Sequence, residues 1–362
     1  MKLNRTRLIS TALTLLAAWL AAQLCLWLRT PLPWMLGPLV VTALASVLGM
    51  PTRSADLLRN AGQWVIGMAL GLYFTPQVGT LVMSLWWAVL LGVVWALAQG
   101  YVFGSWLHGR HRADLAHLDP RSLRATTYFA SAIGGASEMT LLSERAGART
   151  DLVAAAHTLR LLMVVLSVPF AMQWAQAYWG LHVDETLRMV NRTPQWPGLL
   201  WLALASGAGA LLLLALRRAN PWFMGALLAS MGVTLMGLQW SAVPQGLSNA
   251  AQLAIGVSLG VKFRKDFIHT APQWMVSVAL GTLGMMLSSA LFAWVLSQGT
   301  DLHVATLSLG TSPGGIAEMA ITAKVLQLGV PVVTAFQVSR LVAVLLLVGP
   351  LFRLEERRIP VA

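Results

Sequence analysis

Hydrophobic residues fill several long stretches of the chain with few charged interruptions. The clearest runs cover residues 8–28, 79–104, 152–175, 196–216 and 272–297. A helix needs about 20 apolar residues to cross the hydrocarbon core of a bilayer, and it satisfies its own backbone hydrogen bonds there. The pattern therefore predicts an all-α polytopic membrane protein. We interpret the first run as a retained helix rather than a signal peptide, because a similar run recurs deep inside the chain.

The same order of elements is written twice. The aligned blocks are PWMLG (33–37) with PWFMG (221–225), NAGQWVIGMALGLYF (60–74) with NAAQLAIGVSLGVKF (249–263), and GGASEM (134–139) with GGIAEM (314–319). The shift between the copies falls from 189 to 180 residues along the chain, which places an insertion in the first half at residues 106–123. The sequence predicts a first repeat at 1–175, a linker at 176–196 and a second repeat at 197–362.

The distribution of lysine and arginine predicts how the repeats face. Basic residues gather in loops on one side of the membrane if each Gly-Gly segment forms a broken or re-entrant hairpin. Each half then has five spans, and because five is odd the second half is inverted. This gives about ten transmembrane helices plus two broken hairpins, with both termini cytoplasmic in a bacterial inner membrane. Inverted repeats with interrupted helices indicate a secondary transporter whose site lies near the midplane.

Two of the 13 acidic residues, Glu138 and Glu318, lie inside the Gly-Gly segments. A carboxylate at membrane depth costs roughly 2.5 kcal/mol or more, so we expect both to bind a proton or a coupling cation. The structural alternative is a helix-start cap, in which the glutamate favours the positive end of the helix dipole. The two roles are compatible.

We expect the substrate site to combine unwound backbone with polar side chains from equivalent positions of the two halves. Glycine pairs free backbone carbonyl and N–H groups for a solute, mid-helix arginines need a partner, and amides begin the two helices that carry a Gly-x-x-x-Gly pattern. The predicted residues are Gly134, Gly135, Ser137, Gly314, Gly315, Arg160, Arg340, Asn60, Gln63, Asn249 and Gln252.

Alternatives remain open for several of these side chains. Each arginine can form an ion pair with a glutamate of the Gly-Gly segments or clamp a substrate carboxylate. The amides can line the site or hold helices together, and the Gly-x-x-x-Gly pairs favour close helix packing. His157, at the position of Gln337 in the second half, is a candidate proton relay. Glu144 and Lys324 occupy equivalent positions with opposite charge.

Other classes of function fit poorly. The net charge of +12 is spread between apolar runs and forms no basic module, so no nucleic acid is expected as a partner. Signatures of nucleotide binding and hydrolysis are absent, and we predict neither an enzyme nor a cofactor or metal site. The alternative to a transporter is a membrane sensor that influences gene expression indirectly, with the basic, loop-like segment at 106–123 as its partner surface.

The duplicated Pro-Trp-x-x-Gly, Asn-x-x-Gln-x-x-Ile-Gly and Gly-Gly-x-x-Glu-Met blocks resemble the bacterial membrane AbrB-like family with internal duplication, over nearly the whole chain. Its members carry labels such as AbrB family transcriptional regulator or putative ammonia monooxygenase. The family is also similar to the cation/proton-antiporter and anion-transporter folds. That similarity implies a core of crossed broken helices and a panel that often dimerises. The expected partners are the lipid bilayer, a small solute or ion and, in that arrangement, a second copy of the chain.

Overall fold

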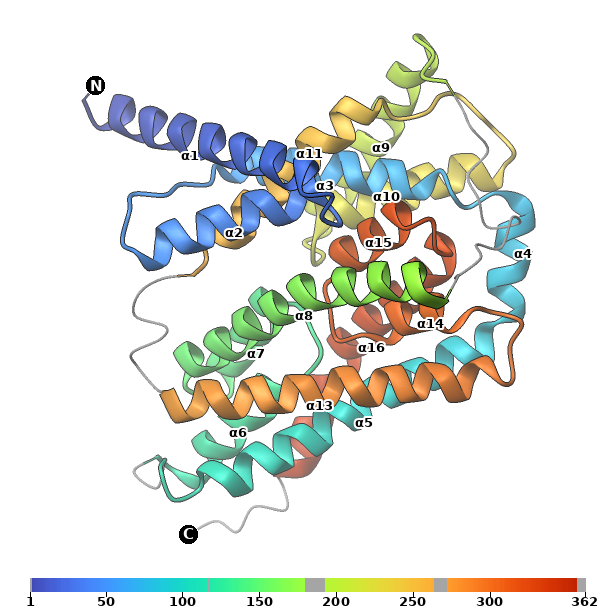
Figure 1. Ribbon diagram of the computed structural model, residues 1–362. Coiled ribbons are helices and arrows are strands. Elements are labelled where there is room, and N and C mark those ends of the chain that lie inside the picture. The colour runs from blue at the N-terminus through green and yellow to red at the C-terminus, as the bar shows by residue number, and fades with distance from the viewer. Residues whose placement is uncertain (1, 116–117, 180–192, 264–271, 357–362) are drawn as a thin grey trace. The chain divides into compact units, whose positions relative to one another are not determined.

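The computed structural model describes residues 2–115, 118–179, 193–263 and 272–356, and all regular structure in these ranges is α-helical (Figure 1). The all-α prediction is confirmed. The chain divides into two compact units, each of which draws on both halves of the sequence. The first unit comprises residues 1–84, 169–266 and 320–331, and the second comprises residues 85–168, 267–319 and 332–362.

The first unit is a helical bundle in which helices of the first half of the sequence pack against helices of the second half. Its elements are α1 (Lys2–Trp27), α2 (Pro33–Val47), α3 (Asp56–Gly71), α4 (Pro76–Ser84), α9 (Gly198–Ala215), α10 (Pro221–Leu235) and α11 (Gln245–Gly260). Helix α3 packs on α10, while α11 packs on α2 and also meets α3. A Cβ on Gly71 would lie 2.7 Å from the carbonyl oxygen of Leu227, and one on Gly260 would lie 2.6 Å from that of Leu39. The predicted close packing through Gly-x-x-x-Gly is confirmed, since only glycine permits these approaches.

The second unit contains the two Gly-Gly breaks. It is built from α5 (Trp86–His111), α6 (Pro120–Ser131), α7 (Ala136–Arg145), α13 (Pro272–Ser297) and α14 (Val304–Thr311), with parts of α8 (Thr150–Trp179), α15 (Ile316–Val325) and α16 (Val330–Glu356). Helix α5 packs on α6 before the first break, and α13 packs on α14 before the second. The pairs α6/α7 and α14/α15 are the predicted interrupted elements.

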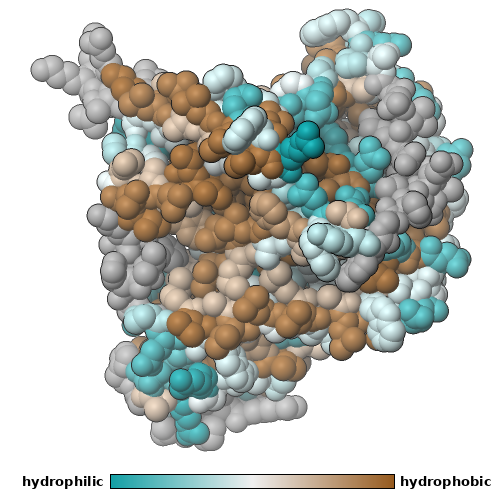
Figure 2. Space-filling view, in the orientation of Figure 1, coloured by the Kyte–Doolittle hydropathy of each residue, from teal (hydrophilic) through white to brown (hydrophobic). Residues whose placement is uncertain are grey.

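Six described helices are long and apolar enough to cross a membrane alone, namely α1, α5, α8, α9, α13 and α16. Helices α3 and α4 pass the same criterion only as a pair, bent by 89° at their junction. Large apolar side chains remain exposed along these helices, for example Leu13 at 61% and Leu287 at 73%. Figure 2 shows this hydrophobic colour along the outward faces of α1 and α13. Exposed apolar faces on helices of this length are unfavourable in water and favourable in contact with lipid, so the chain is a multi-pass membrane protein.

The backbone repeats as the sequence does. All positive-φ residues of the described chain fall into pairs at the spacing of the repeats: Arg29 with Arg217, Leu32 with Asn220, Gly49 with Gly237, and Gly147 with Gln327. Non-glycine residues rarely adopt this conformation, so its recurrence at four matched positions shows that the halves share their local turns.

The expectation that the insertion at 106–123 is a loop was wrong at both ends of the segment. Helix α5 continues to His111 and α6 begins at Pro120, and the described residues 112–115 and 118–119 lie outside the helices. His111 is buried, with Nε2 2.8 Å from Ser277 Oγ and Nδ1 3.0 Å from Asp114 Oδ2. These polar contacts stabilise the last turn of α5, which carries its basic residues. In the predicted linker, α8 runs to Trp179, and residues 180–192 lie outside the described ranges.

Candidate substrate and ion site

Each glutamate of the Gly-Gly segments folds back over a glycine. Helix α7 starts directly after Gly135, which caps it in an extended conformation (φ −67°, ψ 139°), and Glu138 lies in the first turn. A Cβ on Gly135 would overlap Glu138 Oε2, and a Cβ on Gly315 would overlap Glu318 Oε2. A glutamate at the third helical position that reaches back to the cap residue has the geometry of a capping box. The Gly-x-x-Glu spacing is therefore explained by space for the carboxylate.

The first glycine of each pair makes room for the methionine that ends the motif. A Cβ on Gly134 would lie 2.7 Å from Met139 Cε, and one on Gly314 would lie 2.9 Å from Met319 Cγ. Both methionines are fully buried. Within the six-residue motif, the first glycine therefore leaves space for the methionine side chain and the second leaves space for the glutamate side chain. Sequence reasoning missed the methionines, although their recurrence in both copies was a usable signal.

Both predicted arginines are buried and bind the end of the helix that precedes the break. Arg160 donates from Nη1 to Ser131 O (3.2 Å) and from Nη2 to Ala132 O (2.9 Å). Arg340 donates from Nη1 to Ser312 O (2.5 Å), at the cap of α14, and from Nη2 to Gly314 O (2.6 Å), inside the break. The last carbonyls of a helix lack partners within it and carry partial negative charge, which a guanidinium neutralises.

The ion-pair alternative is weakened for the first arginine. Among the described residues, no ion pair joins Arg160 to Glu138, and its donors go to backbone oxygens instead. Arg340 uses Nη1 and Nη2, while its buried Nε has no hydrogen-bond partner within the described part of the chain. An N–H donor that is available beside a broken helix is a suitable contact for a bound anion.

His157 and Gln337 hold the two arginines in the same way. His157 Nδ1 lies 2.7 Å from Arg160 Nη2, and its Nε2 lies 2.9 Å from Phe129 O. Gln337 Oε1 accepts from Arg340 Nη2 at 2.6 Å, and its Nε2 donates to Leu309 O at 2.7 Å. Because the guanidinium can only donate, Nδ1 must accept and Nε2 must carry the proton. The neutral imidazole of His157 therefore makes the same pair of hydrogen bonds, one accepted and one donated, as the amide of Gln337. This favours a role of His157 in positioning the arginine over a role as a proton relay.

The two breaks lie together in the second unit. A Cβ on Gly314 would lie 2.9 Å from Val164 Cγ1, on the helix that carries Arg160. Arg340 Nη2 donates to the carbonyl oxygen of the same Gly314, so the helices that carry the two arginines both border the second break. Phe336 packs between the halves, 2.8 Å from the Cβ position of Gly92 and 3.1 Å from that of Gly310. Two buried positive charges and the two helix starts, α7 and α15, thus create a region of positive potential.

The predicted site residues fall into two groups. The second unit brings together Gly134, Gly135, Ser137, Glu138, Arg160, Gly314, Gly315, Glu318 and Arg340. The first unit holds Asn60, Gln63, Asn249 and Gln252. Ser137 is exposed and Glu138 is half-buried, whereas Glu318 is only 7% exposed. The halves therefore give their glutamates different access to solvent.

Two of the four amides have identified hydrogen-bond partners. Asn60 Oδ1 accepts from Arg59 Nη2 at 3.5 Å. The Asn249 amide lies 2.9 Å from Gln245 Nε2, and with its oxygen and nitrogen exchanged it accepts from Trp34 Nε1 on α2 at 3.1 Å. Gln252 is buried. At the start of the same helix as Asn249, Ser248 accepts from Lys324 Nζ at 3.1 Å. Glu144, the counterpart of Lys324, is exposed at the end of α7. A role of these amides in holding helices fits this geometry, and a role in binding a solute stays a prediction.

Sequence reasoning overlooked a buried amide beside the second break. Gln99 Nε2 on α5 donates to Ser288 Oγ (2.7 Å), Ser289 Oγ (3.1 Å) and Met285 O (3.1 Å) on α13. Ser289 in turn donates to Thr311 O at the end of α14 (3.2 Å). The signal was a lone glutamine in the apolar run 79–104, since a polar residue in a spanning helix usually faces a protein partner.

Comparison with known proteins places the chain in a wider group. A family model described as "Transition state regulatory protein AbrB" matches residues 34–356. "Uncharacterized protein YhjN" of Bacillus subtilis is 26% identical over 348 residues, which cover 89% of this chain and 86% of that protein. "Putative regulator AbrB" of Escherichia coli is 26% identical over 330 residues, which cover 88% of each. These matches span both halves and all the elements that carry the candidate site.

Proposed function

The chain belongs to the AbrB family, and we propose that it is a secondary transporter whose solute site is built on the two broken helix pairs of the second unit. One observation carries the proposal. At each break, a buried arginine binds the end of one short helix while a glutamate folds over the start of the next. The same arrangement occurs twice, and paired helix breaks that meet are the architecture of transporters with alternating access.

The solute is a small anion. Arg160 and Arg340 are both buried beside the breaks, the starts of α7 and α15 add positive dipole ends, and Arg340 Nε has no hydrogen-bond partner within the described residues. A carboxylate or phosphate oxygen beside Gly314 and Gly315 would accept from these donors. The backbone between the short helices supplies further N–H groups.

Glu138 and Glu318 take the coupling proton or cation. The two carboxylates follow their breaks by the same spacing, and Glu318 is almost excluded from solvent. Binding a proton or cation there would lower the cost of its negative charge. The half-exposed Glu138 would exchange its proton with solvent more readily, and this asymmetry gives the two halves different parts in a transport cycle.

The membrane placement follows the same proposal. The two halves are inverted relative to each other, both termini face the cytoplasm, and the protein resides in a bacterial inner membrane as a monomer or homodimer. It acts without cofactor or nucleic acid and performs no enzymatic reaction. The basic loops of the sequence support this orientation through the positive-inside rule.

A proteoliposome assay tests the proposal. Purified protein is reconstituted with a pH-sensitive dye inside, and a panel of small carboxylates and phosphates is added under a proton gradient. A transported anion should produce a proton signal that Glu318→Gln abolishes and that Glu144→Gln, at the exposed end of α7, retains. Full pH-dependent uptake in the Glu318→Gln protein would show that this carboxylate does not couple transport.

A sensor role is the second candidate, and it is favoured by the Escherichia coli relative, which is named "Putative regulator AbrB". Such a protein would bind the same solute without moving it and would signal through a cytoplasmic partner. The basic end of α5 and the segment before α6 are the proposed partner surface. Replacing residues 112–119 with a short neutral linker should then abolish signalling and preserve solute-induced thermal stabilisation, whereas a transporter would keep its uptake.

A further inference from the structure

A cavity of about 1000 Å³ lies in the second unit and reaches the start of the first break at Ala132 and Ile133. Helices α5, α6 and α16 form its walls. Its size is at the upper end of the range for small-molecule sites in proteins. Two of its three walls, α5 and α16, are helices long enough to cross the membrane.

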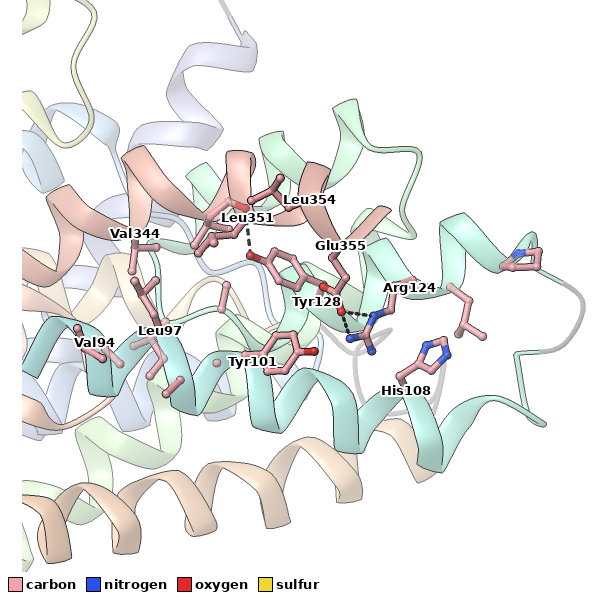
Figure 3. A pocket seen from close by; sticks show the side chains of 18 of the residues that line it. Val94, Leu97, Tyr101, His108, Arg124, Tyr128, Val344, Leu351, Leu354 and Glu355 are labelled. Atoms are coloured by element: carbon pink, nitrogen blue, oxygen red, sulfur yellow. Dashed lines mark hydrogen bonds and ion pairs between the residues drawn. The ribbon is translucent and has the colours of Figure 1, made fainter. Parts of the chain in front are cut away.

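The cavity changes from apolar to charged along its length (Figure 3). Val94, Leu97 and Val344 line one end, Tyr101 and Leu351 the middle, and the charged side chains gather at the other end. That polar end holds His108, Arg124 and Glu355. Arg112 also lines the cavity and follows His108 by four residues, at the cap of α5. A pocket with an apolar length and a basic end matches an amphipathic molecule with a negatively charged head.

Two atoms at the polar end have hydrogen-bonding capacity to spare. Arg124 is paired with Glu355 Oε1 (Nε–Oε1 2.8 Å). Glu355 Oε2 and His108 Nδ1 are buried and have no hydrogen-bond partner within the described ranges. Buried polar atoms are normally satisfied, so each marks a place for a guest or an ordered water. Arg112, exposed at the end of α5, adds a positive charge beside them.

The side walls expose the cavity to the surroundings of the spanning helices. Val94 is 55% exposed, Tyr101 51% and Leu351 40%. On helices that cross a bilayer, such side chains contact acyl chains. A guest can therefore enter from the lipid phase, with its head at the helix end where the basic residues lie.

We propose that this cavity binds a phospholipid whose head group carries a hydrogen-bond donor. The acyl chains lie along Val94, Leu97 and Val344. The phosphate accepts from Arg112 and His108, and a head-group ammonium or hydroxyl donates to Glu355 Oε2. Basic pockets between transmembrane helices bind lipid head groups in this way. Phosphatidylethanolamine and phosphatidylglycerol both supply the donor, and phosphatidylcholine does not.

Native mass spectrometry of the full chain, purified with each of the three phospholipids, tests the site. Phosphatidylethanolamine and phosphatidylglycerol should be retained more strongly than phosphatidylcholine. Arg112→Gln should weaken their retention about fivefold. Arg110→Gln is the matched control, because this exposed residue sits on the same helix end and does not line the cavity. Leu351→Trp should fill the apolar part and reduce retention of both lipids while leaving the basic end intact.

Several results would overturn the proposal. Equal retention by the two arginine variants would show that Arg112 does not read the phosphate, and equal retention of phosphatidylcholine would show that the donor is irrelevant. Displacement of the lipid by glycerol phosphate at similar concentration would identify a site for a soluble anion. Retention of lipid by the monomer and its absence from a dimeric fraction would identify a second copy of the chain as the occupant of the cavity. None of these results depends on transport through the two breaks.

Discussion

Because the Glu318 side chain lies over Gly315, the substitution Gly315→Ala tests the contact between this glutamate and the glycine directly. The added Cβ would overlap the carboxylate of Glu318 and force it to move. Neither Gly315 nor Gly135 has a positive φ, so alanine meets no backbone strain at either position. The substitution therefore displaces the glutamate without removing it.

The expected loss of unfolding free energy differs between the two halves because the two glutamates differ in burial. At Gly135, replacing a glycine cap by alanine costs roughly 0.5–1 kcal/mol, and the half-buried Glu138 can swing toward solvent. At Gly315, the 7% exposed Glu318 must also leave its interactions, and contacts to a charged group contribute about 1.5–3 kcal/mol. We expect a loss of about 2–4 kcal/mol for Gly315→Ala and under about 1 kcal/mol for Gly135→Ala.

Thermal unfolding of the purified protein in detergent measures the difference. At about 2–4 °C for each kcal/mol, Gly315→Ala should lower Tm by about 4–16 °C. Gly284→Ala is the control, since no atom lies within 4 Å of its Cβ position and alanine in a helix is favourable by roughly 0.5–1 kcal/mol. In the Glu318→Ala background, Gly315→Ala should cost no more than the cap exchange. Equal Tm values for Gly315→Ala and Gly284→Ala, or no coupling in the double variant, would refute the reasoning.

Three further changes probe the same framework. His157→Gln should keep Tm within about 2 °C of the parent, because Gln337 performs the equivalent task with an amide; a larger loss would show that an amide cannot replace the imidazole at this position. Arg340→Ala should destabilise by about 3 kcal/mol or more, because buried carbonyls lose a charged donor, and near-neutral unfolding would show that the break does not need it. Gly260→Ala should cost several kcal/mol by overpacking against backbone, while Gly232→Ala, with no atom within 4 Å of its Cβ position, should not; similar Tm values for the two variants would contradict the close packing.

Much of the architecture could be predicted because it is written in local pattern. The apolar runs predicted spanning helices, and the duplicated blocks predicted that the two halves share the same order of elements. The Gly-Gly segments predicted the breaks before α7 and α15. The charge of the insertion at 106–123 suggested a loop over its whole length, whereas α5 extends to His111, whose side chain makes buried polar contacts.

The sequence by itself determined which elements exist and which residues recur in both halves, because helix length, breaks and caps depend on neighbours along the chain. Tertiary structure decided which partners those residues meet. Arg160 binds the carbonyls of Ser131 and Ala132 rather than Glu138, and α3 packs on α10 of the other half. Such contacts join residues far apart in the chain, and they depend on packing and on the pairing of buried charges. No local pattern encodes either.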